Sequence, residues 1–359
     1  MSLATINRIE PRSKLRVLVV DDSPSMCKLL EEIINNEPDM ECVGSAPDPY
    51  VAREMIKALD PDAITLDVEM PRMNGLEFLE KLMRLRPMPV LMVSSLTGKN
   101  SEATLHALEL GAMDFVLKQN TSSRKGVSEL AREITGKLRD MVKSSPNLVK
   151  SGPVAVPQAE VSQAISPAIA SKKFIFIGSS TGGTEAVRNF LSVMPPNSPA
   201  ILIAQHMPEH FTGPFARRLN ATCQMTVKEA THNERIQPGH VYVAPGHSHL
   251  QICKSGGMYY TYLSDAEPVN RHRPSVDVLF ESAARYVGKN AIGVMLTGMG
   301  KDGAAGMLKM KEAGAYNMAQ DESSCVVFGM PRAAIELGAT HEVNSLSALP
   351  ERVLAQLVK

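Results

Sequence analysis

The sequence has no net charge, no closely spaced pair of cysteines and no long apolar run. Its 359 residues include 38 Lys plus Arg and 38 Asp plus Glu, so the chain lacks the basic excess typical of nucleic-acid-binding proteins. No run of about 18 apolar residues is present, and the first residues lack the apolar core of a signal peptide. We therefore expect a cytoplasmic protein with no nucleic-acid partner and no membrane insertion.

The cysteines lie far apart in the chain, at Cys27, Cys42, Cys223, Cys253 and Cys325. Their number is odd and no two of them form a CxxC pair, which disfavours both a disulfide framework and a zinc site. We expect free thiols in a reducing compartment.

The chain is long enough for two ordinary domains, each with its own core. Its 44% hydrophobic and 21% charged residues are typical of globular proteins. The stretch 144–171 is rich in Ser, Pro, Ala and Val and has no regular period, which is typical of a linker. We predict a first domain at residues 14–135, a linker at 136–171 and a second domain at 172–359.

Short apolar segments alternate with amphipathic segments in the first half of the chain. The predicted strands are Leu15–Val20, Glu41–Ser45, Ala63–Leu66, Val90–Val93 and Asp114–Leu117. The predicted helices include one that begins at Ser23-Pro24, then Ala52–Leu59 and Gly75–Leu85. This alternation predicts a doubly wound parallel sheet, a flavodoxin-like (βα)5 fold with strand order 2-1-3-4-5.

Three carboxylates follow strands that are neighbours in this predicted order. Asp21 and Asp22 follow the first strand, and Asp67 follows the third. The carboxyl ends of parallel strands meet at one edge of a sheet, so we expect the three acids to converge there. Carboxylate oxygens at such a place suit Mg²⁺, which also binds phosphoryl oxygens.

Two further polar residues end the remaining strands of the same edge. Ser94 or Ser95 ends the fourth strand, and Lys118 ends the fifth. A hydroxyl and an ammonium group would suit a phosphoryl group carried by Asp67. Any one of these residues alone is equally typical of an ordinary solvated strand end.

The segments VLVVDDSPSM, ITLDVEMPRMNGLEFL, VLMVSSLT and GAMDFVLK resemble the receiver domain of two-component response regulators. The resemblance implies that Asp67 is the phosphorylated residue and that Ser94 and Lys118 contact the phosphoryl group. It also implies a Mg²⁺ site formed by Asp21, Asp22, Asp67 and the backbone carbonyl of Glu69.

The second half of the chain starts again with an α/β pattern. The predicted strands are Lys173–Ile177, Ala200–Ala204, Val241–Ala244, Ile252–Cys253, Tyr259–Leu263 and Ala291–Leu296. The predicted helices are one after Gly183, one at Val276–Tyr286 and one that is closed by Gly314. We predict a second doubly wound α/β domain with a mainly parallel sheet.

A candidate nucleophile lies in the first Gly-rich turn of this half. Ser180 is the central residue of a G-x-S-x-G sequence between a predicted strand and a predicted helix, which would expose its hydroxyl at a helix N-terminus. A serine needs a base, and His206 follows the next strand, while Asp302 follows a later strand and would orient the imidazole. A phosphate-binding loop is the alternative, but no lysine follows these glycines.

The other candidates in this half have plainer interpretations. His247 and His249 could form a metal pair, but two histidines without a nearby carboxylate are more typical of a surface loop. Asp302 precedes Gly303, so it could instead serve only as a helix N-cap.

The segments IGSSTGGTEAV, QHMPEHFT, YVAPGHSHL, HRPSVDVLF, LTGMGKDGAAGM and VFGMPRAA resemble the methylesterase domain of chemotaxis response regulators. The whole chain therefore resembles the chemotaxis response regulator protein-glutamate methylesterases, which combine a receiver domain with a methylesterase domain. The resemblance implies a catalytic triad of Ser180, His206 and Asp302. It also implies that the amides of Thr181 and Met299 stabilise the oxyanion.

The same resemblance implies an activity and its control. We expect phosphorylation-activated hydrolysis of glutamate 5-methyl esters on chemoreceptors, with release of methanol, and also deamidation of receptor glutamines. The partners would be the chemoreceptors as substrate and a chemotaxis histidine kinase as phosphodonor. We expect Mg²⁺ in the first domain, no cofactor in the esterase site, and a monomer. The alternatives are a serine esterase or amidase of other specificity and a non-enzymatic output domain.

Overall fold

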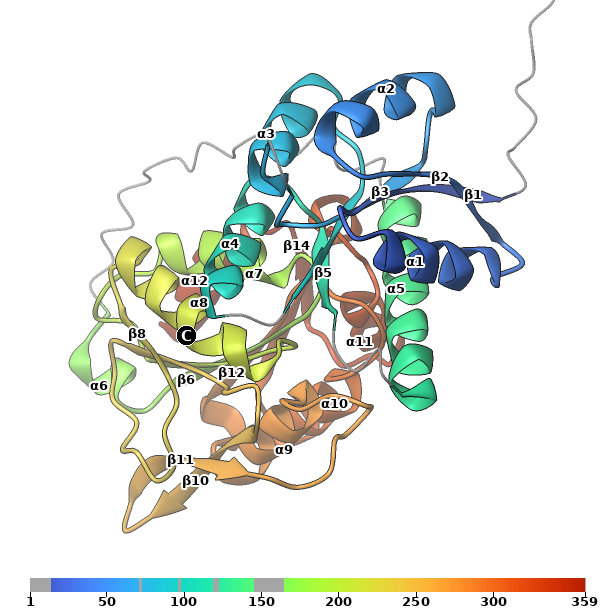
Figure 1. The fold of residues 1–359 in the computed structure, drawn as a ribbon. Coiled ribbons are helices and arrows are strands. Elements are labelled where there is room, and N and C mark those ends of the chain that lie inside the picture. The colour runs from blue at the N-terminus through green and yellow to red at the C-terminus, as the bar shows by residue number, and fades with distance from the viewer. Residues whose placement is uncertain (1–13, 71–72, 96–97, 119–122, 145–164, 359) are drawn as a thin grey trace, which may run out of the picture.

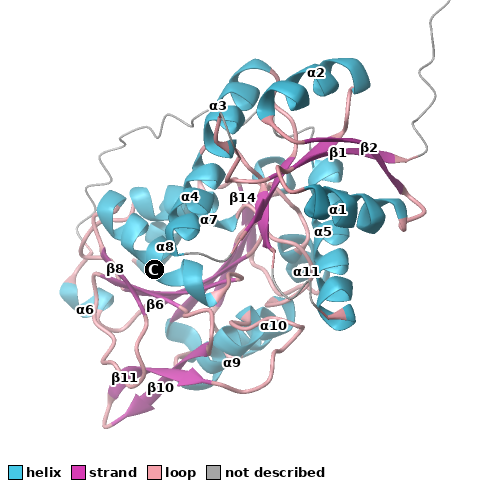
Figure 2. Ribbon diagram, in the orientation of Figure 1, coloured by secondary structure: helices cyan, strands magenta, loops and turns pink. Residues whose placement is uncertain are grey.

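A computed structural model describes residues 14–70, 73–95, 98–118, 123–144 and 165–358. The chain forms two α/β domains that pack against each other (Figure 1). The first domain, coloured blue to green, lies above the second, coloured light green to red. Both domains are built around parallel sheets, as Figure 2 shows by secondary structure.

The first domain contains one five-stranded sheet. Its strands are β1 (Leu15–Val20), β2 (Met40–Ala46), β3 (Ala63–Leu66), β4 (Val90–Ser94) and β5 (Asp114–Leu117). All neighbouring strands pair in parallel, in the order β2-β1-β3-β4-β5. The predicted flavodoxin-like strand order is therefore confirmed.

Five helices accompany this sheet. They are α1 (Pro24–Asn35), α2 (Pro49–Leu59), α3 (Gly75–Leu85), α4 (Gly98–Glu109) and α5 (Arg124–Ser144). Ser23 caps α1 as predicted, because its hydroxyl accepts a hydrogen bond from the amide of Met26 at 3.4 Å. Helix α5 runs through residue 135, where the sequence pattern predicts the domain to end, so the start of the linker has to be moved to the end of α5.

The second domain contains a seven-stranded sheet and a separate hairpin. The sheet consists of β6 (Phe174–Ser179), β7 (Ala200–Gln205), β8 (Thr226–Glu229), β9 (His240–Val243), β12 (Ala291–Met295), β13 (Tyr316–Gln320) and β14 (Glu342–Asn344). Its order is β14-β13-β12-β6-β7-β9-β8, and every pairing in it is parallel. The antiparallel hairpin is formed by β10 (His249–Ser255) and β11 (Met258–Ser264). The predicted mainly parallel α/β fold is confirmed.

Helices and short 3-10 turns connect these strands. The helices are α6 (Pro167–Ala170), α7 (Gly183–Ser192), α8 (Glu209–Thr222), α9 (Val276–Tyr286), α10 (Ala304–Glu312), α11 (Met330–Glu336) and α12 (Leu349–Leu357), and the 3-10 turns are η2 (Gly288–Asn290) and η3 (Glu322–Ser324). Strand β6 is buried along its whole length, as expected of a central parallel strand. Its carboxyl end is therefore held rigidly within the domain.

The two domains share one continuous hydrophobic cluster. Phe115 of β5 stacks on Phe211 of α8, with ring centroids 4.5 Å apart. At the edge of this contact, the Arg218 side chain donates to Glu109 of α4 over 3.0 Å. The interface thus combines buried aromatic surface with an ion pair between α4 and α8.

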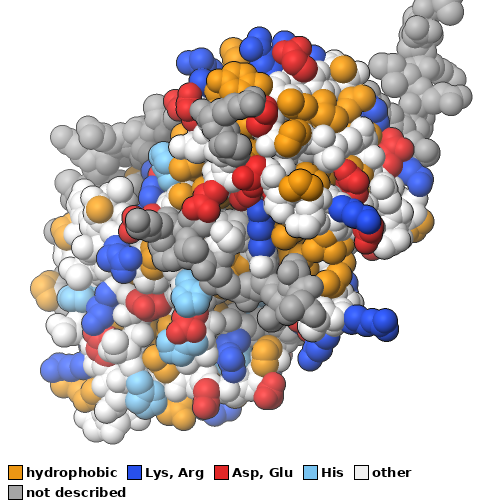
Figure 3. Space-filling model, viewed as in Figure 1, with side chains coloured by type: hydrophobic (Ala, Val, Ile, Leu, Met, Phe, Trp, Pro, Cys, Tyr) orange, Lys and Arg blue, Asp and Glu red, His pale blue; other side chains and the backbone are white. Residues whose placement is uncertain are grey.

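The surface of the molecule is mixed in charge. Acidic and basic side chains are interspersed over both domains on the face seen in Figure 3. All five cysteines are free thiols, and Cys27 and Cys325 are buried. Among the described residues, no helix is long and apolar enough to cross a membrane.

Candidate functional site

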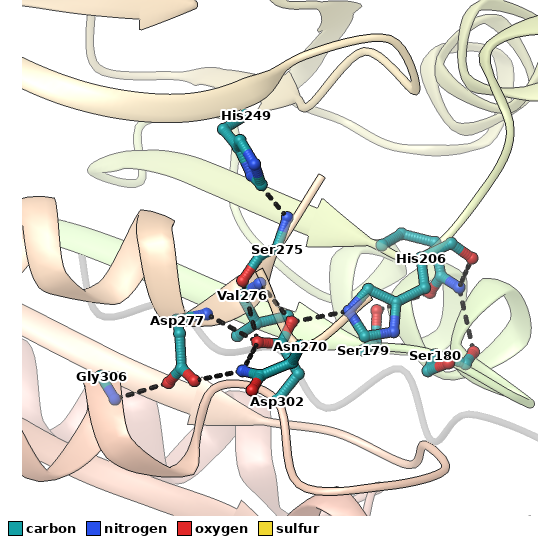
Figure 4. Close-up of polar contacts among 11 residues, drawn as sticks. Ser179, Ser180, His206, His249, Asn270, Ser275, Val276, Asp277, Asp302 and Gly306 are labelled. Atoms are coloured by element: carbon teal, nitrogen blue, oxygen red, sulfur yellow. Dashed lines mark hydrogen bonds and ion pairs between the residues drawn. The ribbon is translucent and has the colours of Figure 1, made fainter. Parts of the chain in front are cut away.

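Three neighbouring strands of the second sheet bring together Ser180, His206 and Asp302. Ser180 directly follows β6, the middle strand of the three, and His206 directly follows β7. Asp302 lies in the loop between β12 and α10, on the other side of β6. The structure places all three residues at the carboxyl edge of this sheet, and Figure 4 shows the His206 ring between Asp302 and the Ser179–Ser180 turn.

His206 and Asp302 form a buried pair. The Nε2 atom of His206 lies 2.8 Å from an Asp302 carboxylate oxygen, and the two side chains are 7% and 1% exposed. Nε2 therefore carries the proton that the carboxylate accepts, and Nδ1 is the ring nitrogen that remains to act as a base. Nδ1 is buried and has no hydrogen-bond partner among the described residues. Nδ1 is thus available to accept a proton, and Figure 4 shows it on the side of the ring that faces the Ser179–Ser180 turn.

Asp302 is held by several donors in addition to His206. Its carboxylate accepts hydrogen bonds from the hydroxyl of Ser275 at 2.8 Å, the amide of Val276 at 2.7 Å and the side-chain amide of Asn270 at 2.7 Å. Burial alone would raise the pKa of Asp302, but its hydrogen bond and electrostatic interaction with His206, together with the bonds from Asn270 and Val276, bring it well below its usual range. Asp302 is therefore ionised near neutral pH and fixes the imidazole.

A second carboxylate lies behind this one. Asp277 accepts from the amide of Gly306 at 2.6 Å and from the side chain of Asn270 at 2.7 Å, so Asn270 bridges the two acids. Burial and the neighbouring charge of Asp302 raise the pKa of Asp277. Sequence reasoning missed Asn270 and Asp277, although Ser275 and Asp277 lie within the HRPSVDVLF segment of the family resemblance.

The turn that carries Ser180 is fixed by backbone contacts. The amide of Ser180 donates to the carbonyl of Thr297 at 3.0 Å, and its own carbonyl accepts from the amide of Gly183 at 2.7 Å and the side chain of Gln205 at 3.0 Å. A Cβ atom at Gly298 would lie only 2.8 Å from the Cβ of Ser180. Glycine at position 298 therefore allows the β12–α10 loop to approach the serine closely.

The residues implied as oxyanion donors flank Ser180. Thr181 follows it directly, and Met299 follows Gly298 in the adjacent loop. Within the described residues, no acceptor is found for the amide of either one, so both amides can donate to a bound group. The hydroxyl of Thr181 donates to the carboxylate of Asp114, a residue of the first domain. A domain contact therefore reaches the residue next to Ser180.

The first domain brings its three predicted acids together. Asp21, Asp22 and Asp67 each offer a carboxylate oxygen within 4.8 Å of the others. Lys118 lies 2.6 Å from Asp67 and 2.7 Å from Asp21. Asp21 and Asp67 are buried whereas Asp22 is exposed, so the cluster opens to solvent on one side.

The electrostatics of this cluster favour a cation. Burial raises the pKa of Asp67, an effect opposed by Lys118 and reinforced by Asp21. Burial would lower the pKa of Lys118, but its bonds to Asp21 and Asp67 raise it. The clustered hard oxygen donors fit Mg²⁺, which would relieve the repulsion between the acids.

The remaining predicted residues also lie near this cluster. Ser94 is buried at the end of β4, and its hydroxyl donates to the carbonyl of Ser95 at 3.3 Å. The side chain of Glu69 is exposed, and its amide donates to Asp67 at 3.4 Å. A Cβ at Gly75 would lie 2.0 Å from the carbonyl oxygen of Asp67, so glycine is required for that approach.

His247 and His249 do not form a metal pair. His249 is only 1% exposed, accepts from the amide of Ser275 at 3.1 Å and donates to the carbonyl of Glu267 at 3.1 Å. His247 is half-exposed and faces Glu209 at 3.5 Å. The surface-loop interpretation is wrong for His249, which instead supports the segment that carries Ser275.

Comparison with known proteins gives relatives for both domains. Residues 17–125 match the family of response regulator receiver domains, and residues 175–353 match the family described as CheB methylesterase. The "Protein-glutamate methylesterase/protein-glutamine glutaminase 2" of Cupriavidus pinatubonensis is 58% identical over 349 residues, which cover 96% of each chain. A protein of Nitrosomonas europaea with the same name, without the numeral, is 59% identical over 96% of this chain and 97% of its own length.

A solved structure resembles the second domain. The crystal structure of the Thermotoga maritima CheB methylesterase catalytic domain is 41% identical, with a TM-score of 0.51. It covers 52% of this chain and 99% of that structure.

Proposed function

Since this chain, with a receiver domain followed by a CheB methylesterase domain, belongs to the family of protein-glutamate methylesterase/protein-glutamine glutaminases, we propose that it demethylates glutamate esters on chemoreceptors. The same site would deamidate receptor glutamines, since both reactions pass through one acyl intermediate. The observation that carries this proposal is the buried His206–Asp302 pair beside Ser180, with Nδ1 of His206 left as a base.

The first half of the reaction is acylation of Ser180. The hydroxyl oxygen of Ser180 attacks the ester carbonyl carbon, while Nδ1 of His206 takes the hydroxyl proton. The amides of Thr181 and Met299 stabilise the negative oxygen of the tetrahedral intermediate. Asp302 stabilises the imidazolium that forms, because it stays ionised. The imidazolium then gives its proton to the departing methoxide, and methanol leaves.

The second half is hydrolysis of the acyl-enzyme. A water molecule attacks the acyl carbon as His206 takes its proton, and the oxygen of Ser180 leaves with that proton returned to it. The product is a glutamate side chain. With a glutamine substrate the leaving group is ammonia, which is a poorer leaving group than methanol, so we expect deamidation to be slower.

Control is assigned to the first domain. Asp67 would be phosphorylated, with Asp21, Asp22 and the carbonyl of Glu69 holding the Mg²⁺ that neutralises phosphoryl charge, and with Ser94 and Lys118 contacting the phosphoryl oxygens. We propose that the first domain covers Ser180 and blocks access to it, which the Asp114–Thr181 bond and the α4–α8 contact support. The packing of the first domain on the second would weaken when Asp67 carries the added charge.

The proposed partners follow from this assignment. The substrate is a methyl-accepting chemoreceptor, and the phosphodonor is a chemotaxis histidine kinase. We propose that the enzyme acts as a cytoplasmic monomer and that its esterase site needs no cofactor.

Methanol release from methylated receptor tests the catalytic assignment. Wild type should release methanol, and Ser180→Ala should lower the rate by about 10³-fold or more. Ser192→Ala is a matched control, because Ser192 ends α7 away from the site and its hydroxyl donates only to Asn189. Demethylation by Ser180→Ala at the wild-type rate would rule out the assigned nucleophile, and release from any simple ester but not from receptor would favour a general esterase.

A small phosphodonor tests the control. With Mg²⁺ present it should raise the wild-type rate but not the rate of Asp67→Asn. Asp62→Asn is the control, because Asp62 lies at the other end of β3 and should leave the activation intact. Equal rates for wild type with and without the phosphodonor would contradict the proposal.

A further inference from the structure

A second histidine contacts the catalytic histidine. The His272 ring stacks face to face on the His206 ring, with centroids 3.6 Å apart and planes within 6° of parallel. No other ring pair among the described residues is as close; His341 on Tyr316 and His240 on Tyr242 are 4.5 Å and 6.2 Å apart. The contact is therefore tight enough to restrict rotation of the His206 ring.

The segment that carries His272 is anchored at the site itself. His272 and Val269 exchange backbone hydrogen bonds of 2.9 Å and 3.1 Å, which close a short turn before α9. Asn270 within this turn donates to Asp302, and Arg273 just beyond it donates to the carbonyl of Asp265 at 3.0 Å. The same turn thus fixes both the carboxylate and the stacked ring.

These two contacts constrain His206 in complementary ways. The Asp302 bond fixes the direction of Nε2 but leaves the ring free to pivot about that bond. A flat partner on one face removes the pivot, because a tilted His206 ring would collide with His272. Both constraints together direct Nδ1 toward the Ser180 side of the site.

A neutral His272 ring would suit a position stacked on the protonated ring of His206. The charged and titratable groups around it are His206, Asp302, Arg271 of its own turn and Lys137 of α5. Burial, together with His206, lowers the pKa of His272 to about 4. His272 is therefore neutral near pH 7, and the face of a neutral aromatic ring attracts a cation.

We propose that His272 is a positioning residue for the hydrolysis: its ring, stacked on His206, directs Nδ1 toward Ser180 and stabilises the imidazolium formed when Ser180 is deprotonated. The inference rests on the proposed function, because it needs His206 as the base. No charge is transferred to His272, which acts only through its contact with the ring of His206.

Variants that separate a flat ring from simple volume test the proposal. In phosphodonor-activated enzyme, His272→Ala should lower kcat for methanol release by about 10- to 100-fold and leave KM within about twofold, because ring alignment and not receptor binding is lost. His272→Phe should recover most of kcat, whereas His272→Leu, which fills a similar volume without a flat face, should not.

His240→Ala is the matched control. His240 also stacks on an aromatic ring, Tyr242, but it lies at the amino end of β9, whereas the site lies at the carboxyl ends of the strands. This variant should therefore keep wild-type kcat. Thermal unfolding of each variant checks folding, and the Phe and Leu variants still decide the question if the alanine variant is unstable. Equal kcat for the Phe and Leu variants, or wild-type kcat in the alanine variant, would overturn the proposal. Absence of methanol release by the wild type would instead refute the proposed function.

Discussion

Asp302 is the most heavily bonded residue of the candidate site. Its carboxylate accepts hydrogen bonds from His206, Asn270, Ser275, Val276 and, at 3.4 Å, Asp277. The backbone donors among these lie in the first turn of α9, so Asp302 satisfies the N-terminus of that helix from a distant loop. The N-cap position of α10 is occupied by Gly303, so the alternative of Asp302 as a cap of its own helix is wrong.

We predict that Asp302→Asn destabilises the protein by about 2–4 kcal/mol, because an amide nitrogen would face donors and lose the charge that they stabilise. The pKa of Asp302 is lowered in the folded state. Its contribution is therefore complete above the unfolded pKa of about 3.9 and is lost as the pH falls through the folded pKa. Denaturant unfolding between pH 3 and 7 measures this.

The difference between wild type and Asp302→Asn should be constant from pH 5 to 7 and should shrink below pH 4. Asp321→Asn is a suitable control, because Asp321 caps a short exposed 3-10 turn. A difference that grows as the pH falls would contradict the sign of the shift.

The sequence allows the residues of the triad to be predicted because each directly follows a predicted strand or lies in a Gly-rich turn after one. Their surroundings do not have this property. Asn270 and His272 lie in an irregular turn whose path depends on tertiary contacts, and neither belongs to a periodic pattern. His272 is the first residue of the HRPSVDVLF segment and Asn270 lies two residues before it, so the family resemblance alone hinted at a role.

At the scale of elements, α4 and α8 form the rim of the domain interface. Glu109 at the end of α4 pairs with Arg218 of α8, and His106 also lies 3.1 Å from Glu109. Reversing the charge of either residue would place two like charges side by side at this contact, without disturbing either hydrophobic core. The pair therefore offers a way to loosen the interface from each side separately.

We predict that Glu109→Arg and Arg218→Glu each raise the unphosphorylated rate of methanol release by about 2- to 5-fold, since exposed ion pairs contribute little. The double reversal should restore the low basal rate. Stopped-time methanol assays without phosphodonor measure all four proteins. An unchanged rate in both single variants would show that this contact does not limit access to Ser180.

The elements that sequence patterning does not predict share a physical cause. Helix α8 contains Gly213-Pro214, a pair that predicts the end of a helix. The helix continues through it because its buried face packs in the domain interface. Strand β13 contains Asn317 and Gln320, both fully buried. The side-chain nitrogen of Asn317 donates to the carbonyls of Met307 and Ala339, so a polar residue can lie buried in this strand although the sequence pattern does not indicate one.

At the scale of the whole molecule, buried side chains connect the first domain to the site in the second domain. Lys137 of α5 pairs with Asp114 at 3.1 Å and donates to the carbonyl of Phe115 at 2.6 Å, while Asp114 accepts from Thr181. A Cβ at Gly136 would lie 3.0 Å from the terminal methyl of Met299. The start of β5 and the middle of α5 thus lie against both residues assigned to oxyanion binding.

We predict that phosphodonor with Mg²⁺ speeds hydrogen exchange by about 10-fold in α8 and in the turn after β6, because these segments lose the contacts made by the first domain. Exchange in β12 and β13, which lie inside the second domain, should not change. Mass spectrometry of proteolytic peptides measures both regions.

Removal of Mg²⁺ by a chelator should abolish the difference, and so should Asp67→Asn. Uniform acceleration across the second domain would indicate general destabilisation and not release of an interface.

The neighbouring strands β12, β6 and β7 are not consecutive along the chain. The residues that they position are therefore synthesised at different times. The five-stranded domain leaves the ribosome first and can fold alone, because its sheet needs no strand from the other half. Ser180 and His206 follow, but Asp302 emerges only in the last part of the chain. Under the proposed control, the first domain would be in place before the hydrolytic site is complete, so a newly made enzyme would be inhibited from the start.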